Sequence, residues 1–547
     1  MDYNKLAELL FPDVVNGPDY YEKKFPERDL PKGAEVTRMA PSPTGFIHLG
    51  NLYSALADER IAHRNGGVFY LRIEDTDEKR KVDGAVETII NVLRYFDIEF
   101  DEGAGFTDAD PQNVYGPYFQ RQRVEIYHAY AKDLVKRGLA YPCFCTEEEL
   151  EEVRKEQEED KAMTGYYGKY AVCRNLTLED IEAKLKAGLT YVLRLRSGSP
   201  DKEIVFHDRI MGEIKLPENI HDIVLLKRDG VPTYHFAHAI DDHLMRTTMV
   251  IRGGEWLASV PTHYELFHVL GFKMPSYGHT AHLMKFDEET GGKRKLSKRK
   301  DPELSLDYYR KDGYHPMAMK VYLLTLLNSN FEEWYEKFPD KDIKEFPFSV
   351  EKMSQSGALF DKDKLHNICK NELAKLSEEE MYDFLYDWAA GNEPEKAKVW
   401  FANREKMLAI LRLYMGIGMK RRRKDFIYAK QIFELIGYFF EENNDAEEFK
   451  FDKDTVKEIL KEYLAGYDHN DDNSAWFDKL KKVADNLSFA SDMKAYKANP
   501  ENYKGSISDI AEVVRIAVTG RANTPDLWTI IHIIGEDAMK AKIERLC

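Results

Sequence analysis

Apolar and polar positions in the first part of the chain follow the pattern of short buried strands joined by one helix. Val36 to Ala40 predicts a strand, Pro41 to Gly45 a turn, His48 to Asn65 a helix, and Val68 to Ile73 a second strand. The order strand, loop, helix, strand is typical of a parallel sheet that binds a nucleotide. We therefore expect a Rossmann-like domain in this part of the chain.

The pattern changes twice further along the chain. From about residue 131 to 215, closely spaced cysteines and a highly charged helical segment, Glu147 to Lys161, predict an inserted subdomain. Strand-like runs at Ile223 to Leu226 and Met249 to Ile251 then indicate that the first sheet resumes. From about residue 303 onward helical periodicity dominates, which predicts an all-α second half.

These patterns give a fold class of α/β plus all-α. A chain of 547 residues is too long for one hydrophobic core, because domains commonly contain about 100 to 200 residues. The predicted segments are an N-terminal extension (1–33), the two halves of a Rossmann-like domain (34–130 and 216–300), the insertion (131–215), a connecting region (301–350) and a helical domain (351–547).

Composition indicates a globular protein rather than a disordered or membrane-spanning one. Hydrophobic residues make up 43% and charged residues 32% of the chain, and no run of about 18 apolar residues occurs. The first residues lack the basic start and long apolar stretch of a signal peptide. Five cysteines in so long a chain do not suggest a disulfide framework. We expect a cytoplasmic protein with no membrane contact.

The net charge of −17, taken alone, argues against a nucleic-acid partner, because phosphate binding uses Lys and Arg. Two basic clusters nevertheless stand out, Lys293 to Lys300 and Lys420 to Lys424. Each is either a solvated charged surface or a local face for phosphate groups.

One candidate phosphate site follows the first predicted strand. The sequence RMAPSPTGFIHLGN, from Arg38 to Asn51, leads into a helix, where backbone N–H groups and the helix dipole favour phosphate. Gly45 and Gly50 allow close approach of the backbone, and His48 can donate a hydrogen bond to charge that develops in a transition state. The alternative is a Pro/Gly turn with an incidental histidine.

The second candidate is the loop KLSKR, Lys295 to Arg299, which follows Thr290-Gly291-Gly292. Lys295 and Lys298 lie three residues apart and could neutralise a triphosphate that is attacked at its α-phosphorus. A basic loop alone is usually surface. Both clusters in one chain, on either side of an insertion, favour a nucleotide-dependent enzyme.

These stretches resemble a known family. HLGN at His48 to Asn51 is similar to the HIGH signature, and KLSKR to the KMSKS signature, of class I aminoacyl-tRNA synthetases. The stretches RMAPSPTGFIHLGN, LRIEDTD, PTYHFAHAIDDHLM, VIRGGEW and KLSKRKDPELSLDYY resemble the glutamyl-tRNA synthetases in their order and spacing. The resemblance runs from about residue 36 to the end, where Gly357 to Asp361 and Thr519 to Arg521 resemble the bacterial type.

The resemblance implies a pocket for L-glutamate, which we call the glutamate pocket. Its residues would be Arg38, Ala40, Ser42, Glu74, Tyr234, His238 and Arg252. Two arginines and one carboxylate match the two carboxylates and one ammonium of glutamate. Glutamine would leave a desolvated guanidinium underpaired. Which arginine binds which carboxylate is left open, and the histidine at 238 departs from many relatives.

The resemblance also implies sites for ATP and for the tRNA terminus. ATP would contact His48, Gly50, Glu255, Trp256, Lys295 and Lys298, with Mg²⁺ bridging phosphate oxygens. His48, Lys295 and Lys298 would be catalytic. The terminal adenosine of tRNA would lie near Thr76, Asp77 and Arg80. Asn51 replaces the last histidine of the first signature, and we expect activity to survive this change.

A zinc site is implied in the insertion, where some glutamyl enzymes bind the metal with three Cys and one Tyr. The candidate ligands are Cys143, Cys145, Cys173 and Tyr170, or Tyr167 if the loop folds differently. Three thiolates and a phenolate would satisfy tetrahedral zinc. The alternative is three reduced cysteines in a small core.

The implied activity is ATP-dependent ligation of L-glutamate to the 3′ end of tRNA(Glu) through a glutamyl adenylate, with release of AMP and pyrophosphate. The insertion would bind the acceptor end, 301–350 the stem and 351–547 the anticodon, and we expect a monomer. Charging of tRNA(Gln) as well is left open. A glutaminyl enzyme, a truncated enzyme that modifies a base and a non-catalytic homologue fit less well, given Arg252, the helical C-terminal half, and both His48 and Lys298.

Overall fold

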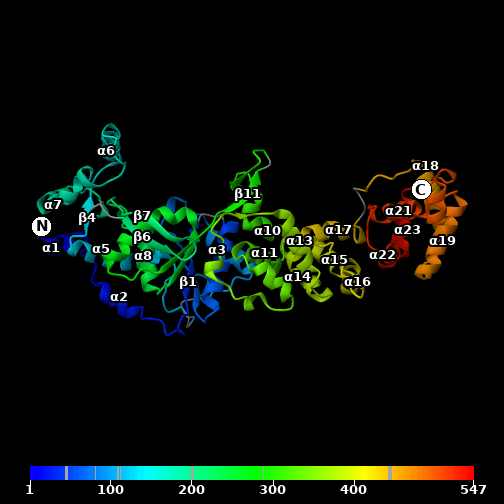
Figure 1. The fold of residues 1–547 in the computed structure, drawn as a ribbon, viewed down its shortest axis with the longest axis horizontal. Helices are drawn as coiled ribbons and strands as arrows, with labels where there is room; N and C mark the ends of the chain where they lie inside the picture. The colour runs from blue at the N-terminus through cyan, green and yellow to red at the C-terminus, as the bar shows by residue number, and fades with distance from the viewer. Residues whose placement is uncertain are drawn as a thin grey trace. The chain divides into compact units, whose positions relative to one another are not determined.

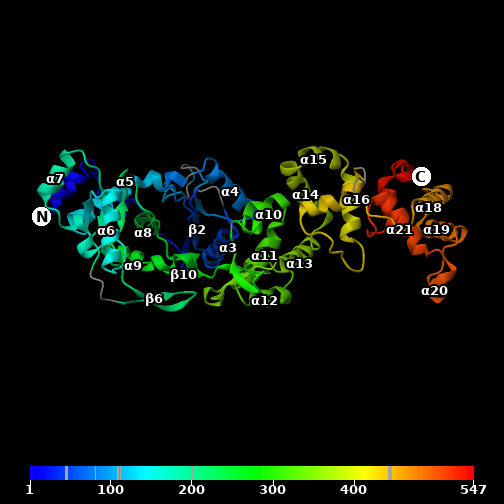
Figure 2. The same ribbon diagram turned by 90° about the horizontal axis from the view of Figure 1, so that it is seen from above.

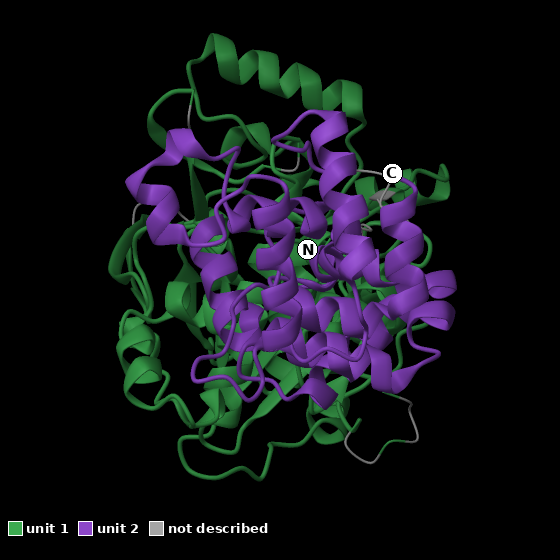
Figure 3. Cartoon of the chain, turned by 90° about the vertical axis from the view of Figure 1, so that its right-hand side faces the viewer, with its two compact units in different colours: residues 1–310, 320–361 green, residues 311–319, 362–547 purple. Residues whose placement is uncertain are grey.

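The structure is a computed structural model that describes residues 1–43, 47–80, 82–106, 110, 113–198, 203–287, 289–297, 299–441 and 446–547. The chain divides into two compact units, coloured separately in Figure 3. Unit 1 contains residues 1–310 and 320–361, and unit 2 contains residues 311–319 and 362–547. In the described part of the chain, every helix is too short or too polar to cross a membrane.

Unit 1 is built on two groups of strands that meet side by side. One is a parallel sheet in the order β1 (Val36–Met39), β2 (Val68–Leu71), β3 (Glu102–Gly103). The other has the order β7 (Gly212–Pro217), β6 (Glu203–Asp208), β10 (Ser276–Thr280), β9 (Met249–Gly253). They meet where the Thr248 N–H donates to the Val36 carbonyl at 2.9 Å. This confirms the Rossmann-like expectation.

Helices connect the strands of this sheet. α3 (Leu49–His63) links β1 to β2 and lies beside β1 (Figure 1), while α4 (Ala85–Tyr95) links β2 to β3. α8 (Tyr234–Leu244) precedes β9, and α9 (Val260–Leu270) links β9 to β10. The predicted strand, helix and strand at 36–73 therefore exist, each ending one or two residues before its predicted end.

A separate antiparallel sheet forms from β4 (Ala140–Cys143), β5 (Val192–Leu195) and β8 (Val224–Leu226). The expectation that residues 223–226 resume the first sheet was wrong. β8 pairs with β5, so the first sheet resumes at β6 and then at β9 and β10. β6 lies within the stretch 131–215 that was predicted as the insertion, and it pairs with β7 along six residues.

The remaining elements of unit 1 surround these sheets. They are α1 (Tyr3–Leu10), α2 (Pro18–Lys24), α5 (Val124–Lys136), α6 (Glu147–Glu159), α7 (Leu178–Lys186), α12 (Phe331–Lys337) and a small sheet of β12 (Gly292–Lys295), β11 (Leu283–Asp287) and β13 (Ala358–Leu359). The N-terminal extension 1–33 packs on the rest of the chain, because Leu6, Tyr21 and Phe25 are buried. α10 (Leu306–Asp312) and α11 (Pro316–Leu327) include residues of both units.

Unit 2 is helical in its described part, as the periodicity predicts. Its helices are α13 (Lys362–Leu373), α14 (Glu378–Asn392), α15 (Pro394–Trp400), α16 (Arg404–Met415), α17 (Ala429–Ile436), α18 (Lys453–Gly466), α19 (Asn473–Asn486), α20 (Met493–Ala498), α21 (Ile507–Thr519), α22 (Leu527–Ile534) and α23 (Glu536–Glu544). α14, α15 and α16 lie together in Figure 2. Buried apolar side chains from α13 to α23 form one core.

Candidate active site

The predicted site residues gather at the place where the two groups of strands meet. In open α/β sheets, ligands bind outside the carboxyl ends of the strands at the point where the connections change direction. β1 and β9 flank this point, and they carry Arg38 and Arg252 near their carboxyl ends. The backbone beyond β2 comes close to the end of β1, because the Glu74 N–H donates to the Pro41 carbonyl at 3.0 Å.

Arg38 is held by a buried carboxylate that the sequence reading did not single out. Its Nε donates to Asp242 Oδ2 at 3.3 Å, and Arg72 donates to Asp242 Oδ1 at 2.6 Å. Burial alone would raise the pKa of Asp242, but the charges of Arg38 and Arg72 outweigh it and lower that pKa. Asp242 therefore stays ionised and fixes both guanidinium groups.

Glu74 joins the same network from the other side. Arg72 Nη2 donates to Glu74 Oε1 at 3.1 Å. Burial raises the pKa of Glu74, and the charges of Arg72 and Arg38 oppose that rise. Arg38, Arg72, Asp242 and Glu74 thus form a charge-balanced cluster at the ends of β1 and β2, which brings together two residues of the glutamate pocket.

Arg252 has quite different partners. Its Nε donates to His279 Nε2 at 3.0 Å, and its Nη1 contacts His263 Nδ1 at 3.1 Å. Because a guanidinium has no acceptor, both histidine nitrogens must accept. Among the residues that the structure describes, no carboxylate pairs with Arg252 and its buried Nη2 has no hydrogen-bond partner. A buried guanidinium held by neutral imidazoles is ready to accept an anion.

Tyr234 and His238 lie on α8 between these two arginines. The His238 ring lies 4.4 Å from the His263 ring and 5.6 Å from the Tyr234 ring, and its Nε2 is 2.8 Å from the Tyr277 hydroxyl. Burial, together with the charges of Arg38 and Arg252, lowers the pKa of His238 well below its usual value. His238 is therefore neutral near pH 7 and presents a polar but uncharged surface.

Ala40 and Ser42 follow β1 directly. Ala40 is half-buried and Ser42 is exposed. The structure thus groups Arg38, Glu74, Tyr234, His238 and Arg252 through shared neighbours, and Ala40 and Ser42 lie just beyond the end of β1.

The first signature lies at the start of α3. His48 is the residue before the helix, and its backbone N–H donates to Asn51 Oδ1 at 3.0 Å. Asn51 is thus the third residue of the helix, and its side chain reaches back to the capping residue His48, which gives this departure a structural role. A Cβ at Gly50 would lie 3.0 Å from His48 Nδ1, so glycine leaves room for the ring. Thr44, Gly45 and Phe46 lie outside the described residues.

The second signature follows the hairpin of β11 and β12. Lys295 ends β12 and is exposed, while Lys298 lies outside the described residues. Asp301 holds this turn, because it accepts hydrogen bonds from the Arg294 guanidinium and from the Ser297 N–H at 2.8 Å. The bonds from Arg294 lower the pKa of Asp301 to about 2.

The backbone brings the two signatures toward each other. His48 forms an antiparallel bridge with Ser305, and the Leu306 N–H donates to the Ile47 carbonyl at 3.1 Å. Ser305 follows the second signature by only six residues. A phosphate held at the start of α3 would therefore lie near the loop that carries Lys295.

The other implied contacts flank this region. Glu255 and Trp256 lie in the short helix Gly254–Ser259 that follows β9, and the Trp256 ring is 4.8 Å from the Tyr234 ring. Thr76 is buried, and its carbonyl accepts a bond from Lys227 at 2.6 Å. Asp77 follows it, and Arg80 belongs to the short helix Glu78–Arg80.

The structure brings the three cysteines of the insertion together. The sulfurs of Cys143, Cys145 and Cys173 lie within 4.8 Å of one another. Hydrogen bonds from the other two thiols lower the pKa of Cys143. The phenol beside them is Tyr166, whose hydroxyl is 3.3 Å from Cys145 Sγ and accepts the Cys173 N–H.

The choice of Tyr170 or Tyr167 as a zinc ligand was therefore wrong. The Tyr170 hydroxyl donates to Asp160 at 2.7 Å, and the Tyr167 hydroxyl donates to the Met163 carbonyl at 2.7 Å. Both hydroxyls therefore bond groups other than the thiols. Tyr166 replaces them in the candidate ligand set.

Several buried residues of the site were missed in the sequence. Arg72 and Asp242 lie within the stretches LRIEDTD and PTYHFAHAIDDHLM, and the spacing of His238 and Asp242 on one helix face could have indicated their contact. His263, His279 and Asp208 carry no such signal, because only strand pairing and packing bring them to Arg252.

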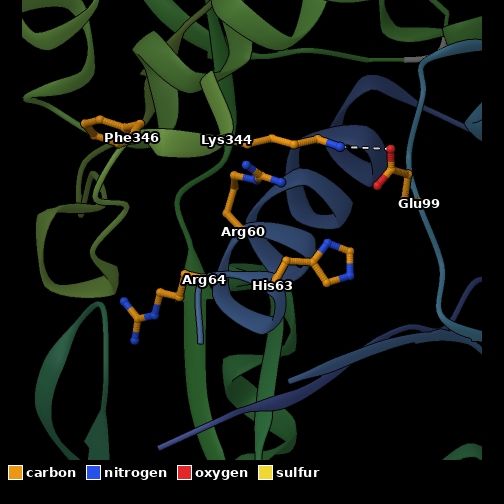
Figure 4. Close-up of a pocket in the computed structure, with 6 residues that line it drawn as sticks. All are labelled: Arg60, His63, Arg64, Glu99, Lys344 and Phe346. Atoms are coloured by element: carbon orange, nitrogen blue, oxygen red, sulfur yellow. Dashed lines mark hydrogen bonds and ion pairs between the residues drawn. The ribbon is translucent and has the colours of Figure 1, made fainter. Parts of the chain in front are cut away.

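A cavity lies at the opposite end of α3. It has a volume of about 270 Å³ and is lined by Arg60, His63, Arg64, Glu99, Lys344 and Phe346 (Figure 4). Lys344 pairs with Glu99 at 2.9 Å across it, and none of its lining residues belongs to a predicted site. The other charged lining residues bond groups outside the cavity lining: Arg60 contacts Glu59, His63 contacts Asp101, and Arg64 donates to the Phe348 carbonyl.

Comparison with known proteins gives consistent matches over the whole chain. Residues 35–367 match the family model for tRNA synthetases class I (E and Q), catalytic domain, and residues 394–547 match an anticodon binding domain. A glutamate–tRNA ligase of Acetivibrio thermocellus is 55% identical, with all of both chains covered. One of Clostridium perfringens is 46% identical over 99% of this chain and 100% of its own.

A solved structure agrees with these sequences. The crystal structure of a glutamate tRNA ligase from Elizabethkingia meningosepticum, in complex with its amino acid, matches with a TM-score of 0.71. It is 28% identical, and the match covers 94% of this chain and 99% of that one.

Proposed function

Since the chain belongs to the class I tRNA synthetases of the glutamate and glutamine group, we propose that it ligates L-glutamate to the 3′ end of tRNA(Glu) at the expense of ATP. The five stretches that resemble glutamyl-tRNA synthetases, the helical unit 2 and the name shared by relatives at 46% to 55% identity all support the glutamate enzyme over the glutamine enzyme.

The observation that carries the proposal is the state of Arg252. Its guanidinium is buried among neutral histidines and has no carboxylate partner in the described part of the chain. A substrate carboxylate would neutralise the charge of Arg252 and accept hydrogen bonds from its guanidinium. The neutral amide of glutamine would leave that charge uncompensated. Arg38, by contrast, is already paired with Asp242.

We assign the side-chain carboxylate of glutamate to Arg252 on this basis. The α-carboxylate of glutamate then faces the start of α3, where His48 and Gly50 would contact the phosphates of ATP. The ammonium group of glutamate would bind Glu74 and Ser42. The α-carboxylate attacks the α-phosphorus of ATP and pyrophosphate leaves, so that no general base is needed. His48, Lys295 and Lys298 stabilise the charge on the phosphates, and a Mg²⁺ ion bound with ATP would add positive charge there.

The terminal ribose of tRNA then attacks the activated carbonyl and AMP leaves. Thr76, Asp77 and Arg80 follow β2 beside Glu74, which supports their place near the terminal adenosine. Residues 394–547 supply the anticodon-binding part. tRNA(Gln) is a second candidate substrate, the expected site of action is the cytoplasm, and we expect a monomer.

Charging tests the proposal directly. Labelled glutamate and, separately, labelled glutamine are offered with ATP to purified tRNA(Glu) and tRNA(Gln), and reactions without ATP serve as the control. Glutamate on tRNA(Glu) supports the proposal, and glutamate on both tRNAs extends it to a non-discriminating enzyme. If folded protein charges neither tRNA with glutamate, the proposal is wrong.

The insertion fits a structural zinc ion. The sulfurs of Cys143, Cys145 and Cys173 lie close enough to share one ion, and the Tyr166 phenol supplies a fourth donor. Bound there, zinc would tie β4 to the turn before α7 and would hold the insertion in shape.

Metal analysis of the purified protein tests this site. We expect about one zinc per chain, a loss of zinc in Cys173→Ser, and weaker retention against a chelator in Tyr166→Phe. Tyr170→Phe is the matched control, because its phenol bonds Asp160 and should leave zinc content unchanged. Absence of zinc from the wild-type protein after purification without chelator would contradict the site.

A further inference from the structure

A row of polar side chains crosses three strands beneath Arg252. β9 and β10 pair in parallel with Arg252 opposite His279, and β10 pairs with β6 where Tyr277 lies opposite Asp208. Successive side chains on a strand point to opposite faces, so Tyr277 and His279 share a face. The register therefore places Asp208, His279 and Arg252 in one line that ends at the site.

The hydrogen bonds along this row can run in one direction only. Arg252 Nε is a donor, so His279 Nε2 at 3.0 Å must accept. A neutral His279 then carries its proton on Nδ1, which lies 2.6 Å from Asp208 Oδ2 and donates to it. Burial lowers the pKa of His279, which favours this neutral form.

Asp208 is itself fixed by the backbone. Its Oδ1 accepts from the N–H groups of Ile210 at 2.9 Å and Met211 at 2.8 Å, and the His279 N–H also reaches it. No Lys or Arg pairs with Asp208 among the described residues, although it is buried. Its one side-chain partner is His279, so its carboxylate acts on the tautomer of that ring.

A second chain of histidines constrains the other side of the guanidinium. Arg252 Nη1 donates to His263 Nδ1, so the neutral His263 carries its proton on Nε2 and donates to His235 Nδ1 at 2.9 Å. The Tyr277 ring lies 4.8 Å from the guanidinium carbon. These contacts occupy Nε, Nη1 and one face, and leave Nη2 for a ligand.

We propose that Asp208 and His279 are positioning residues for substrate recognition: the Asp208 carboxylate fixes the tautomer of His279, and His279 aims Arg252 at the side-chain carboxylate of the amino acid. This inference rests on the proposed function. It assigns specificity to residues of β6 and β10 that touch no substrate.

A neutral acceptor suits this position better than a carboxylate would. Asp or Glu beside Arg252 would compensate its charge and compete with the substrate carboxylate. An imidazole orients the guanidinium through a hydrogen bond and leaves its full charge to the ligand. The negative charge of Asp208 is separated from Arg252 by the imidazole ring of His279.

Steady-state charging kinetics of the full chain with tRNA(Glu) test the inference. His279→Phe keeps a ring but removes the acceptor, and we expect a roughly 10- to 100-fold higher KM for glutamate with an unchanged KM for ATP. His279→Gln should recover much of the loss, because its amide oxygen can accept from Arg252. The KM for glutamate of Asp208→Asn should lie between the values for His279→Gln and His279→Phe.

His207→Phe is the matched control, because His207 precedes Asp208 on β6 and its side chain is 76% exposed. Thermal unfolding of each variant distinguishes a loss of folding from a changed orientation of the Arg252 guanidinium. If His279→Phe does not fold, His279→Gln and Asp208→Asn still test the proposed roles of His279 and Asp208. Equal rises in the KM for ATP and for glutamate, or an unchanged KM for glutamate in folded His279→Phe, would overturn the inference. A wild-type protein that charges no glutamate would instead contradict the proposed function.

Discussion

The glutamate pocket and the second-signature loop present their positive charges in opposite ways. Arg252 is buried and each of its bonded nitrogens has a fixed partner, whereas Lys295 is exposed at the end of a hairpin strand. A fixed guanidinium recognises the shape and charge of a small ligand, while an exposed ammonium on a flexible stem can follow a phosphate whose charge changes. The difference indicates that the glutamate pocket selects the amino acid, whereas the second-signature loop contributes to the rate of the reaction at the phosphates.

Replacement of Arg252 should have the largest effect. Arg252→Gln removes the charge that receives the substrate carboxylate, and two charge-assisted hydrogen bonds contribute about 3 kcal/mol or more. We expect kcat/KM for glutamate to fall roughly 100-fold or more, with binding of ATP little changed. Charging kinetics measure this, and a loss shared equally by glutamate and ATP would remove the distinction between the two regions.

Replacement of Lys295 should have a smaller effect of a different kind. Lys295→Ala removes one of the charges that stabilise the leaving pyrophosphate, and single groups of this type contribute roughly 100-fold to kcat. We expect a lower kcat and an unchanged KM for glutamate. Lys293→Ala, an exposed lysine on the same strand, is the control. A raised KM for glutamate in Lys295→Ala would contradict the division of roles.

The smallest expected effect is on the pH dependence of stability, and it concerns His235, which contacts Arg252 only through His263. Burial lowers the pKa of His235 to about 4, and the charge of Arg252 adds to this shift. Because the unfolded chain then binds a proton that the folded chain does not, stability is lost as pH falls from about 6.5 toward 4.

His235→Gln should therefore flatten the decline of Tm between pH 6.5 and 4 relative to the wild type. Melting curves at several pH values measure it, and exposed His207→Gln serves as the comparison. An identical slope in His235→Gln and wild type would show that His235 does not titrate differently on folding.

Local pattern was enough to predict part of this structure. The strand, helix and strand at 36–73 depend on nearby residues, and the first signature lies at the start of that helix as the pattern predicted. The partner of β8 depends on strand pairing, which a short apolar run does not encode. Three tyrosines lie close together in this stretch, and only the contacts of the folded chain show that Tyr166 faces the thiols while Tyr167 and Tyr170 bond other groups.

The network around Arg252 shows the same limit more sharply. Asp208, His263 and His279 come from three separate elements and meet only through strand register and helix packing. Nothing in their sequence neighbourhoods marks them as partners of Arg252. Motif resemblance thus singled out Arg252, and the fold supplied the histidines that hold its guanidinium.

The most direct test of the account is the ratio of kcat/KM for glutamate and glutamine on tRNA(Glu). A site built around an uncompensated guanidinium should favour glutamate by roughly 1,000-fold or more, because glutamine leaves that charge unpaired. The account predicts that this preference collapses in Arg252→Gln and persists in Lys295→Ala. Comparable use of both amino acids by the wild-type protein would contradict it.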